Sequence, residues 1–150
     1  MRGPSSSHCA ASLRIGRMAR DLMNGDLKDI LIQFDPKSSV AHTHHTQGSD
    51  MGLLGGFLGW EAHDERLTDY QKAIEDADIN VRIEIKDFNA NHPHYLAHPN
   101  AYKLTLKNHK ETHQLIALSI GGGMIEVKEI DQVNVSMAGD YYETLIYVED

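Results

Sequence analysis

The hydrophobic pattern changes its period partway along the chain, and this change limits the possible folds more than any other feature. Up to about residue 77 most apolar residues recur at helical spacing, whereas beyond residue 80 they alternate with polar residues as in β-strands. We predict helices over residues 9–23, 50–60 and 64–77, and strands over residues 28–34, 80–88, 102–107, 113–119, 124–130 and 141–148. This order predicts an α+β domain in which helices pack on one face of a mainly antiparallel sheet.

Length, charge and cysteine count exclude several classes of protein. A chain of 150 residues can bury a core without disulfides or a structural metal. The net charge of −8 disfavours nucleic-acid binding, which needs a basic surface. No apolar run approaches the roughly 18 residues of a membrane span and no signal peptide is recognised, so we expect a cytoplasmic domain without a membrane partner. Cys9 is the only cysteine, which excludes an internal disulfide and an iron–sulfur cluster held by this chain alone.

The first candidate site is the segment GPSSSH, which directly precedes the first predicted helix. Free amides at a helix start, together with the hydroxyls of Ser5, Ser6 and Ser7, form a receptor for an anion such as a carboxylate. His8 could exchange a proton with that anion near neutral pH. The alternatives are that one serine caps the helix while the others are solvated, or that the segment is a cloning remnant.

The second candidate is the histidine-rich segment before the second predicted helix. In an extended segment His42 and His44 share a face and could bind one metal ion, with His98 as a third ligand. Further along, Ser49 or Asp50 would cap the Gly-rich helix that follows, or bind an anion at its start. Capping is the more common role for a carboxylate at such a position.

The third candidate is the loop that contains two His-Pro pairs. His98 and Asn100 can both donate to an oxygen-rich ligand, although turn formation explains most of this composition. The glycine triplet 121–123 lacks the spacing of a dinucleotide-binding loop and is interpreted as a bend. A row of arginines along the first helix is interpreted as a solvated face, with an anion site as the alternative: Arg14, Arg17 and Arg20.

The order of these motifs is more specific than any one of them. GPSSSH is followed by RIGRMAR in a helix, then by GSD before a Gly-Leu-rich helix, then by HPN and by SIGGG. This combination closely resembles the β component of the iron–sulfur-dependent L-serine dehydratases, from Gly3 to about Val148. The resemblance implies a lyase of amino-acid degradation and gluconeogenesis, which converts L-serine to pyruvate and ammonia.

The resemblance also implies a partner and a fold. In the family a separate α component or a fused α domain carries a [4Fe–4S] cluster, one iron of which acts as a Lewis acid on the substrate. The β fold resembles the allosteric substrate-binding domain of some phosphoglycerate dehydrogenases. We expect residues 1–140 to form the β-type domain. Residues 141–150 would be a closing strand or the start of a truncated ACT-like domain, which commonly follows β in two-component members.

The site residues implied by the resemblance include one departure from the family. The three serines would hold the substrate carboxylate, and His8 is the first candidate for proton transfer. Most members write KGHGTD in the segment that ends here at Asp50, and the His of that segment falls on Gln47. Glutamine cannot act as a base, so His45 is an alternative second proton-transfer group. The remaining expected substrate-binding residues are Ser49, Asp50, His98 and Asn100.

Two further hypotheses remain: one proposes a non-catalytic function, and the other concerns assembly into a dimer. Gln47 motivates an alternative in which the chain is a non-catalytic regulatory domain that binds an amino acid or another small carboxylate. A homodimer is also plausible, because the Gly-rich apolar helix at 50–60 needs a closely packed partner surface.

Overall fold

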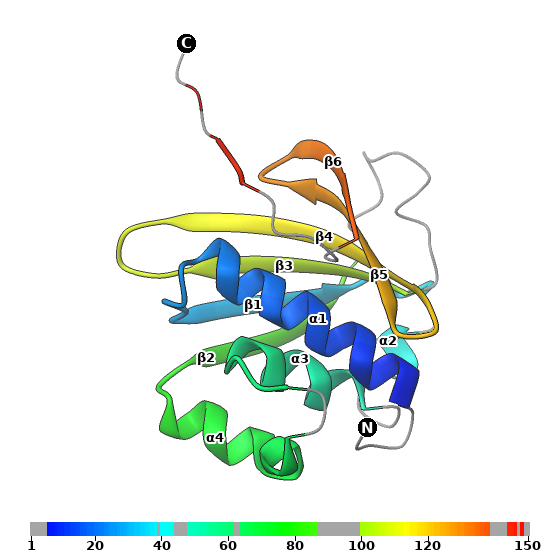
Figure 1. The fold of residues 1–150 in the computed structure, drawn as a ribbon, viewed down its shortest axis with the longest axis vertical. Helices are drawn as coiled ribbons and strands as arrows, with labels where there is room; N and C mark the ends of the chain where they lie inside the picture. Colours follow the sequence, from blue (N-terminus) through cyan, green and yellow to red (C-terminus); the bar gives the residue numbers. More distant parts are fainter. Residues whose placement is uncertain are drawn as a thin grey trace.

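The computed structural model describes residues 6–38, 40–43, 48–61, 64–86, 100–138, 144–146 and 148, with side chains from residue 9 onward and without that of residue 40. The elements in chain order, shown in Figure 1, are α1 (Ser6–Leu22), β1 (Asp29–Phe34), α2 (Val40–Thr43), α3 (Ser49–Phe57), the 3-10 helix η1 (Glu65–Asp69), α4 (Tyr70–Asp76), β2 (Asn80–Ile85), β3 (Ala101–Lys107), β4 (Thr112–Gly121), β5 (Met124–Ile130) and β6 (Val133–Met137).

The six strands form one sheet in the order β2-β1-β3-β4-β5-β6. The prediction of an α+β fold is confirmed, but the sheet is mixed rather than purely antiparallel, because β1 and β2 run parallel. The other four neighbouring pairs are antiparallel. The helices between β1 and β2 provide the long connection that parallel strands need, whereas β3, β4, β5 and β6 are joined by short turns.

The main core lies between α1 and the sheet, and Figure 1 shows α1 and α3 in front of the strands. Alternate residues of β1 point into this core, so Ile30, Ile32 and Phe34 are buried. Burial of each such side chain contributes roughly 1.5–3 kcal/mol. Ile15 of α1 and Met23, which directly follows α1, enter the same cluster and are fully buried.

The glycines of α1 and α3 let these two helices approach closely. A Cβ atom on Gly52 would overlap the carbonyl oxygen of Cys9, and one on Gly56 would overlap that of Leu13. On the α1 side, a Cβ atom on Gly16 would overlap the carbonyl oxygen of Leu53. The partner surface that the Gly-rich helix was expected to need therefore lies within the same chain.

Several sequence predictions of local structure are corrected in detail. The predicted helix at 64–77 is divided into η1 and α4, and the Asp64 side chain accepts a hydrogen bond from the Arg66 amide at the start of η1. The segments α2 and β6 were not predicted, because four and five residues are too short to establish a period. Residues 144–146 and 148 lie outside any strand, and the rest of the prediction for 141–148 lies outside the described residues.

Short turns connect β3 to β4 and β4 to β5, and the predicted bend at the glycine triplet is confirmed. The Asn108 side chain closes the β3–β4 turn by accepting from the amides of Lys110 and Glu111. The glycine triplet 121–123 connects β4 to β5, and all three of its residues have positive φ angles, which non-glycine residues rarely adopt.

Candidate active site

The serine-rich motif and the GSD motif come together because α1 and α3 run in the same direction. Cys9 lies against Gly52 near the start of each helix, and Leu13 lies against Gly56 one turn later. Both helix N-termini therefore lie at one end of the molecule. Their unpaired amides and macrodipoles favour an anion there.

The structure places part of the serine motif inside α1. The helix begins at Ser6, three residues earlier than predicted, so Ser6, Ser7 and His8 form its first turn. Their side chains and the whole of Ser5 lie outside the described part of the chain. A first turn exposes backbone N–H groups that make no bond within the helix.

In the GSD motif the N-cap of α3 is Gly48, with φ 80° and ψ 12°, rather than Ser49 or Asp50. The capping prediction is therefore wrong, and both residues belong to the first turn of α3, where they are buried. The Ser49 hydroxyl oxygen has no hydrogen-bond partner among the described residues. Burying a hydroxyl without a partner costs about 1–3 kcal/mol. The Ser49 hydroxyl is therefore a polar group at the start of α3 that could bind a ligand.

Tyr102 connects this end of α1 to the sheet. Its hydroxyl lies 2.9 Å from the Ser12 hydroxyl oxygen in a fully buried contact. Its ring packs edge-on against Phe34, with ring centroids 5.4 Å apart. Burial raises the pKa of Tyr102, so the phenol stays protonated. The hydrogen-bonded Ser12 hydroxyl opposes this rise, as does, to a lesser extent, the nearby Ser49 hydroxyl, which lies outside hydrogen-bond geometry.

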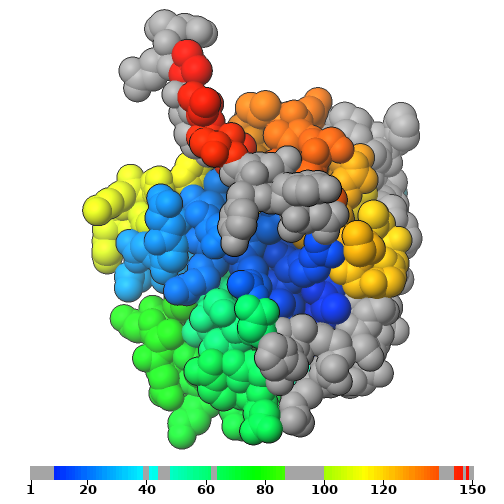
Figure 2. Space-filling view, viewed as in Figure 1, coloured from blue at the N-terminus to red at the C-terminus, as the bar shows by residue number. Residues whose placement is uncertain are grey.

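Asn100 of the HPN motif and the SIGGG motif reach the same end of the fold. The Asn100 carbonyl oxygen accepts from the Ser119 amide at 3.0 Å, which holds the start of β3 beside the end of β4. The following β4–β5 turn reaches α1, since a Cβ atom on Gly123 would lie 3.3 Å from that of Ala10. Figure 2 shows the dark-blue start of α1 beside this yellow-orange turn. The described parts of four motifs, at residues 6–8, 48–50, 100 and 119–123, are thus brought together, whereas His45, Gln47 and His98 lie outside the described residues.

Asp50 supplies the negative charge of this region. Burial raises the pKa of Tyr70 and of Tyr102, and the Asp50 carboxylate raises both pKa values further. Both phenols are thereby kept neutral next to the start of α3.

The arginine row anchors neighbouring segments, so its interpretation as a solvated face needs correction. Arg14 donates to the Ala138 carbonyl at 3.0 Å, and Arg20 donates to the Phe57 carbonyl at 3.0 Å. Arg17 forms a 2.6 Å ion pair with Glu61.

The structure does not support the premise of the histidine metal site. Residues 40–43 form the short helix α2 rather than an extended segment, and the His42 ring nitrogen Nε2 lies 3.1 Å from the Pro36 carbonyl oxygen. His44 and His98 lie outside the described part. Within the ranges that the structure describes, no three His, Cys, Asp or Glu side chains are arranged to hold a metal ion.

Cys9 is fully buried in a small cluster with Leu13, Met51, Trp60 and Leu67. Burial raises the pKa of its thiol. The thiolate form, which binds metals, is therefore disfavoured.

Sequence reasoning missed Ser12 and Tyr102. Both occupy apolar-patterned positions, one on the buried side of α1 and one in an alternating strand, so neither was singled out as a candidate. The only available signal was a hydroxyl group at a position that the helical or strand spacing of apolar residues places in the interior, where polar groups need a hydrogen-bond partner.

Comparison with known proteins identifies the family. Residues 2–130 match the family described as serine dehydratase beta chain. The chain is 33% identical over 150 residues to a probable L-serine dehydratase, beta chain, of Bacillus subtilis (strain 168). It is 29% identical over 147 residues to the L-serine dehydratase, beta chain, of Peptoniphilus asaccharolyticus. The chain belongs to the serine dehydratase beta chain family.

The coverage of these relatives is unequal. The matches include 100% and 97% of this chain but 64% and 63% of the two relatives, so the chain spans just under two thirds of their length. No solved structure matches the chain, and the resemblance to the phosphoglycerate dehydrogenase domain is therefore not confirmed. Among the described helices, none is long and apolar enough to cross a membrane.

Proposed function

We propose that the chain is the β component of an iron–sulfur-dependent L-serine dehydratase, which deaminates L-serine to pyruvate and ammonia together with a cluster-bearing α component. The observation that carries this proposal is the convergence of the described parts of four motifs, at residues 6–8, 48–50, 100 and 119–123, at one end of a chain of this family. The beta-chain names of the relatives support the existence of an α partner.

The cluster belongs in this proposal to the α component. Cys9 is the only thiol of this chain and is buried in an apolar cluster, so the chain cannot supply a cysteine ligand set. The [4Fe–4S] cluster, when bound in α, supplies a Lewis-acidic iron for the substrate hydroxyl and carboxylate.

The proposed contribution of this chain is binding and proton transfer. The N-terminal amides of α1 and α3, with Ser5, Ser6 and Ser7, would hold the substrate carboxylate, since parallel dipoles favour an anion between them. His8 would move a proton to or from the substrate, with His45 or Gln47 as the second group at this step.

The remaining expected residues would close the pocket. Ser49 has a buried hydroxyl without a partner among the described residues, which supports a polar contact to substrate. His98 and Asn100 would donate from the side of β3, and Asp50 would attract the substrate ammonium group.

The proposal is tested by anaerobic co-expression of this chain with its α component, followed by a pyruvate-release assay with L-serine. We expect pyruvate only when both chains are present. A complex with an intact cluster that releases no pyruvate would contradict the proposal. If that complex releases no pyruvate but calorimetry shows that this chain binds L-serine, the result would favour the regulatory-domain alternative that Gln47 suggests.

A further inference from the structure

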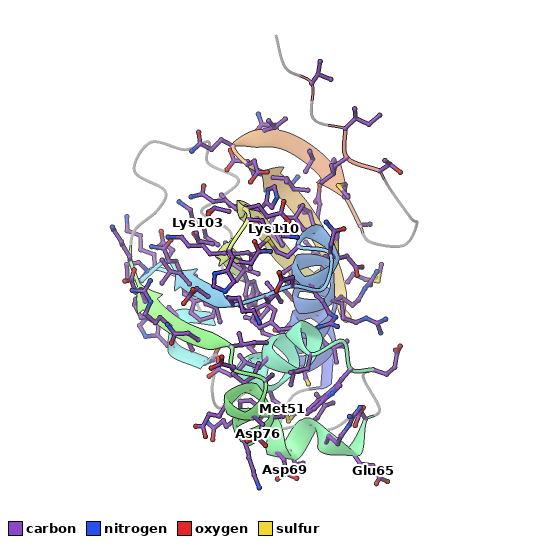
Figure 3. All side chains as sticks on the ribbon, turned by 90° about the vertical axis from the view of Figure 1, so that its left-hand side faces the viewer. Met51, Glu65, Asp69, Asp76, Lys103 and Lys110 are labelled. Carbon is purple, nitrogen blue, oxygen red and sulfur yellow. The ribbon has the colours of Figure 1, made fainter. Side chains whose placement is uncertain are left out.

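The outer edge of β2 carries an apolar stripe that the rest of the described chain leaves exposed. β2 is the first strand in the sheet order, and Figure 3 shows it as the green strand at the left border of the ribbon. Ile83 is 39% exposed and Ile85 is 48% exposed, although both lie in a regular strand. Proteins normally protect such edges, because an unpaired strand is a template for another chain.

The backbone of β2 determines which residues can pair outward. The Asn80 amide donates to the Lys28 carbonyl at 2.8 Å, and the Lys86 amide donates to the Phe34 carbonyl at 3.0 Å. The even-numbered residues between them therefore direct their backbone groups toward β1. Because successive residues of a strand alternate, residues 81, 83 and 85 direct their N–H and C=O groups to the free edge.

The two faces of β2 differ in chemistry. Ile83 is paired with Ile32, and Ile85 with Phe34, so the apolar stripe continues the core face of β1. Arg82 and Glu84 lie on the opposite face, where the Gln33 side-chain amide donates to Glu84 at 3.3 Å. The Arg82 side chain makes no ion pair or hydrogen bond with the described residues and is exposed.

We propose that the free edge of β2 binds β2 of a second copy of this chain, antiparallel, with Ile83 opposite Ile83 of that copy. This register makes residues 81, 83 and 85 the hydrogen-bonded pairs, as their outward backbone groups require. On the apolar face it places Val81 opposite Ile85 of the other copy. On the opposite face it places Arg82 of each copy opposite Glu84 of the other, so two such charge pairs form.

Charge complementarity selects this register over its neighbours. A two-fold axis at Arg82 would place the two guanidinium groups opposite each other, and an axis at Glu84 would oppose the two carboxylates. Like charges directly opposite one another destabilise a strand pair, whereas opposite charges stabilise it. The strand is therefore self-complementary in one antiparallel register, which favours a second copy over an unrelated strand.

The resulting assembly is one continuous sheet of two copies. The axis is perpendicular to the sheet, so both helix layers lie on the same side and the apolar stripes join across the axis. This inference is independent of the proposed function, because β2 carries none of the motif residues at the candidate site.

The test is sedimentation equilibrium of the full chain and of two charge variants, Arg82→Glu and Glu84→Arg. We expect the wild-type chain to dimerise and each variant to weaken the dimer at least about tenfold, because attractive cross-strand pairs become repulsive. An equimolar mixture of the two variants should restore the dimer, since two carboxylates of one chain then face two guanidinium groups of the other.

The control variant is Lys110→Glu, which makes the same change of charge at an exposed residue of the β3–β4 turn, labelled in Figure 3. It should leave the dimer unchanged. A wild-type chain that remains monomeric at about 1 mM would overturn the proposal and leave the edge to a strand of another protein. A dimer that is insensitive to both charge variants would also overturn it.

Discussion

At the scale of single residues, the Ser12–Tyr102 contact shows how the candidate site is joined to the core. A buried hydroxyl pair 2.9 Å apart connects α1 to β3 directly behind the motif segments. Such a pair is costly to break on one side only, because the remaining hydroxyl loses both its partner and its access to water.

We expect Tyr102→Phe to lower the free energy of unfolding by about 1–3 kcal/mol, because Ser12 is left buried without a partner. The double variant with Ser12→Ala should lose less than the sum of the two single variants. Urea denaturation measures both quantities. Tyr70→Phe is the control, since among the described residues that partly buried phenol accepts a single long hydrogen bond of 3.4 Å, from Gln71. Equal losses for the two tyrosines would contradict this account.

A second prediction at this scale concerns His113, which lies 2.6 Å from an Asp131 carboxylate oxygen and 3.1 Å from one of Glu111. Burial lowers the pKa of His113, but the two carboxylates outweigh it and the pKa is raised. A raised folded-state pKa contributes stability that is fully present below the ordinary value of about 6.5 and is lost as the pH rises through the folded-state pKa.

The stability difference between the wild-type chain and His113→Gln should therefore be larger at about pH 5.5 than at about pH 9. Urea denaturation at both pH values measures it. The side chain of His113 is 13% exposed, so solvent screening reduces the effect only in part. A difference that stays constant or grows with pH would show that the carboxylates do not hold the charged imidazole.

At the scale of elements, the packing of α1 on α3 determines where the motifs meet. Glycines permit backbone contact between the two helices at two successive turns, at Gly52 and at Gly56, and the order of these contacts shows that the helices run in the same direction. Loss of this contact would separate the two helix N-termini on which the proposed carboxylate site depends.

We expect Gly56→Ala to destabilise the chain by about 3 kcal/mol, because the new methyl group would meet the α1 backbone, which cannot move locally. Gly55→Ala is the matched control in the same helix, since its methyl group would overlap the end of the Leu67 side chain rather than backbone and would make an ordinary contact with Trp60. Both variants gain the same helix propensity of about 1 kcal/mol. Thermal denaturation should rank Gly56→Ala well below Gly55→Ala, and the reverse order would refute backbone contact.

The long elements could be predicted from the sequence and the short or non-local features could not. Seven-residue strands such as β3 and the 17-residue helix α1 contain enough residues to reveal their period. The parallel pairing of β1 with β2 depends on the path of the helices between them, which no local pattern encodes. The burial of Ser49 and its missing partner depend on packing against distant segments, so the sequence indicated a cap instead.

At the scale of the whole molecule, the fold brings the described parts of the motifs to one end and leaves the β2 edge, which we propose for self-association, without motif residues. The opposite end, at the β3–β4 turn, holds none of the motif residues. The proposed substrate site and the proposed dimer edge thus lie on separate surfaces, and charge changes on β2 should leave the motif end intact.

The most direct test of the central claim is the rate of pyruvate formation from L-serine by the complex with α, for the wild-type chain, His8→Ala and His109→Ala. Loss of a proton-transfer group should lower kcat about 10²–10⁴-fold in His8→Ala, whereas His109→Ala, an exposed residue of the β3–β4 turn, should match the wild type. An active wild-type complex in which both variants retain full activity would contradict the assignment of the motif end as the catalytic surface.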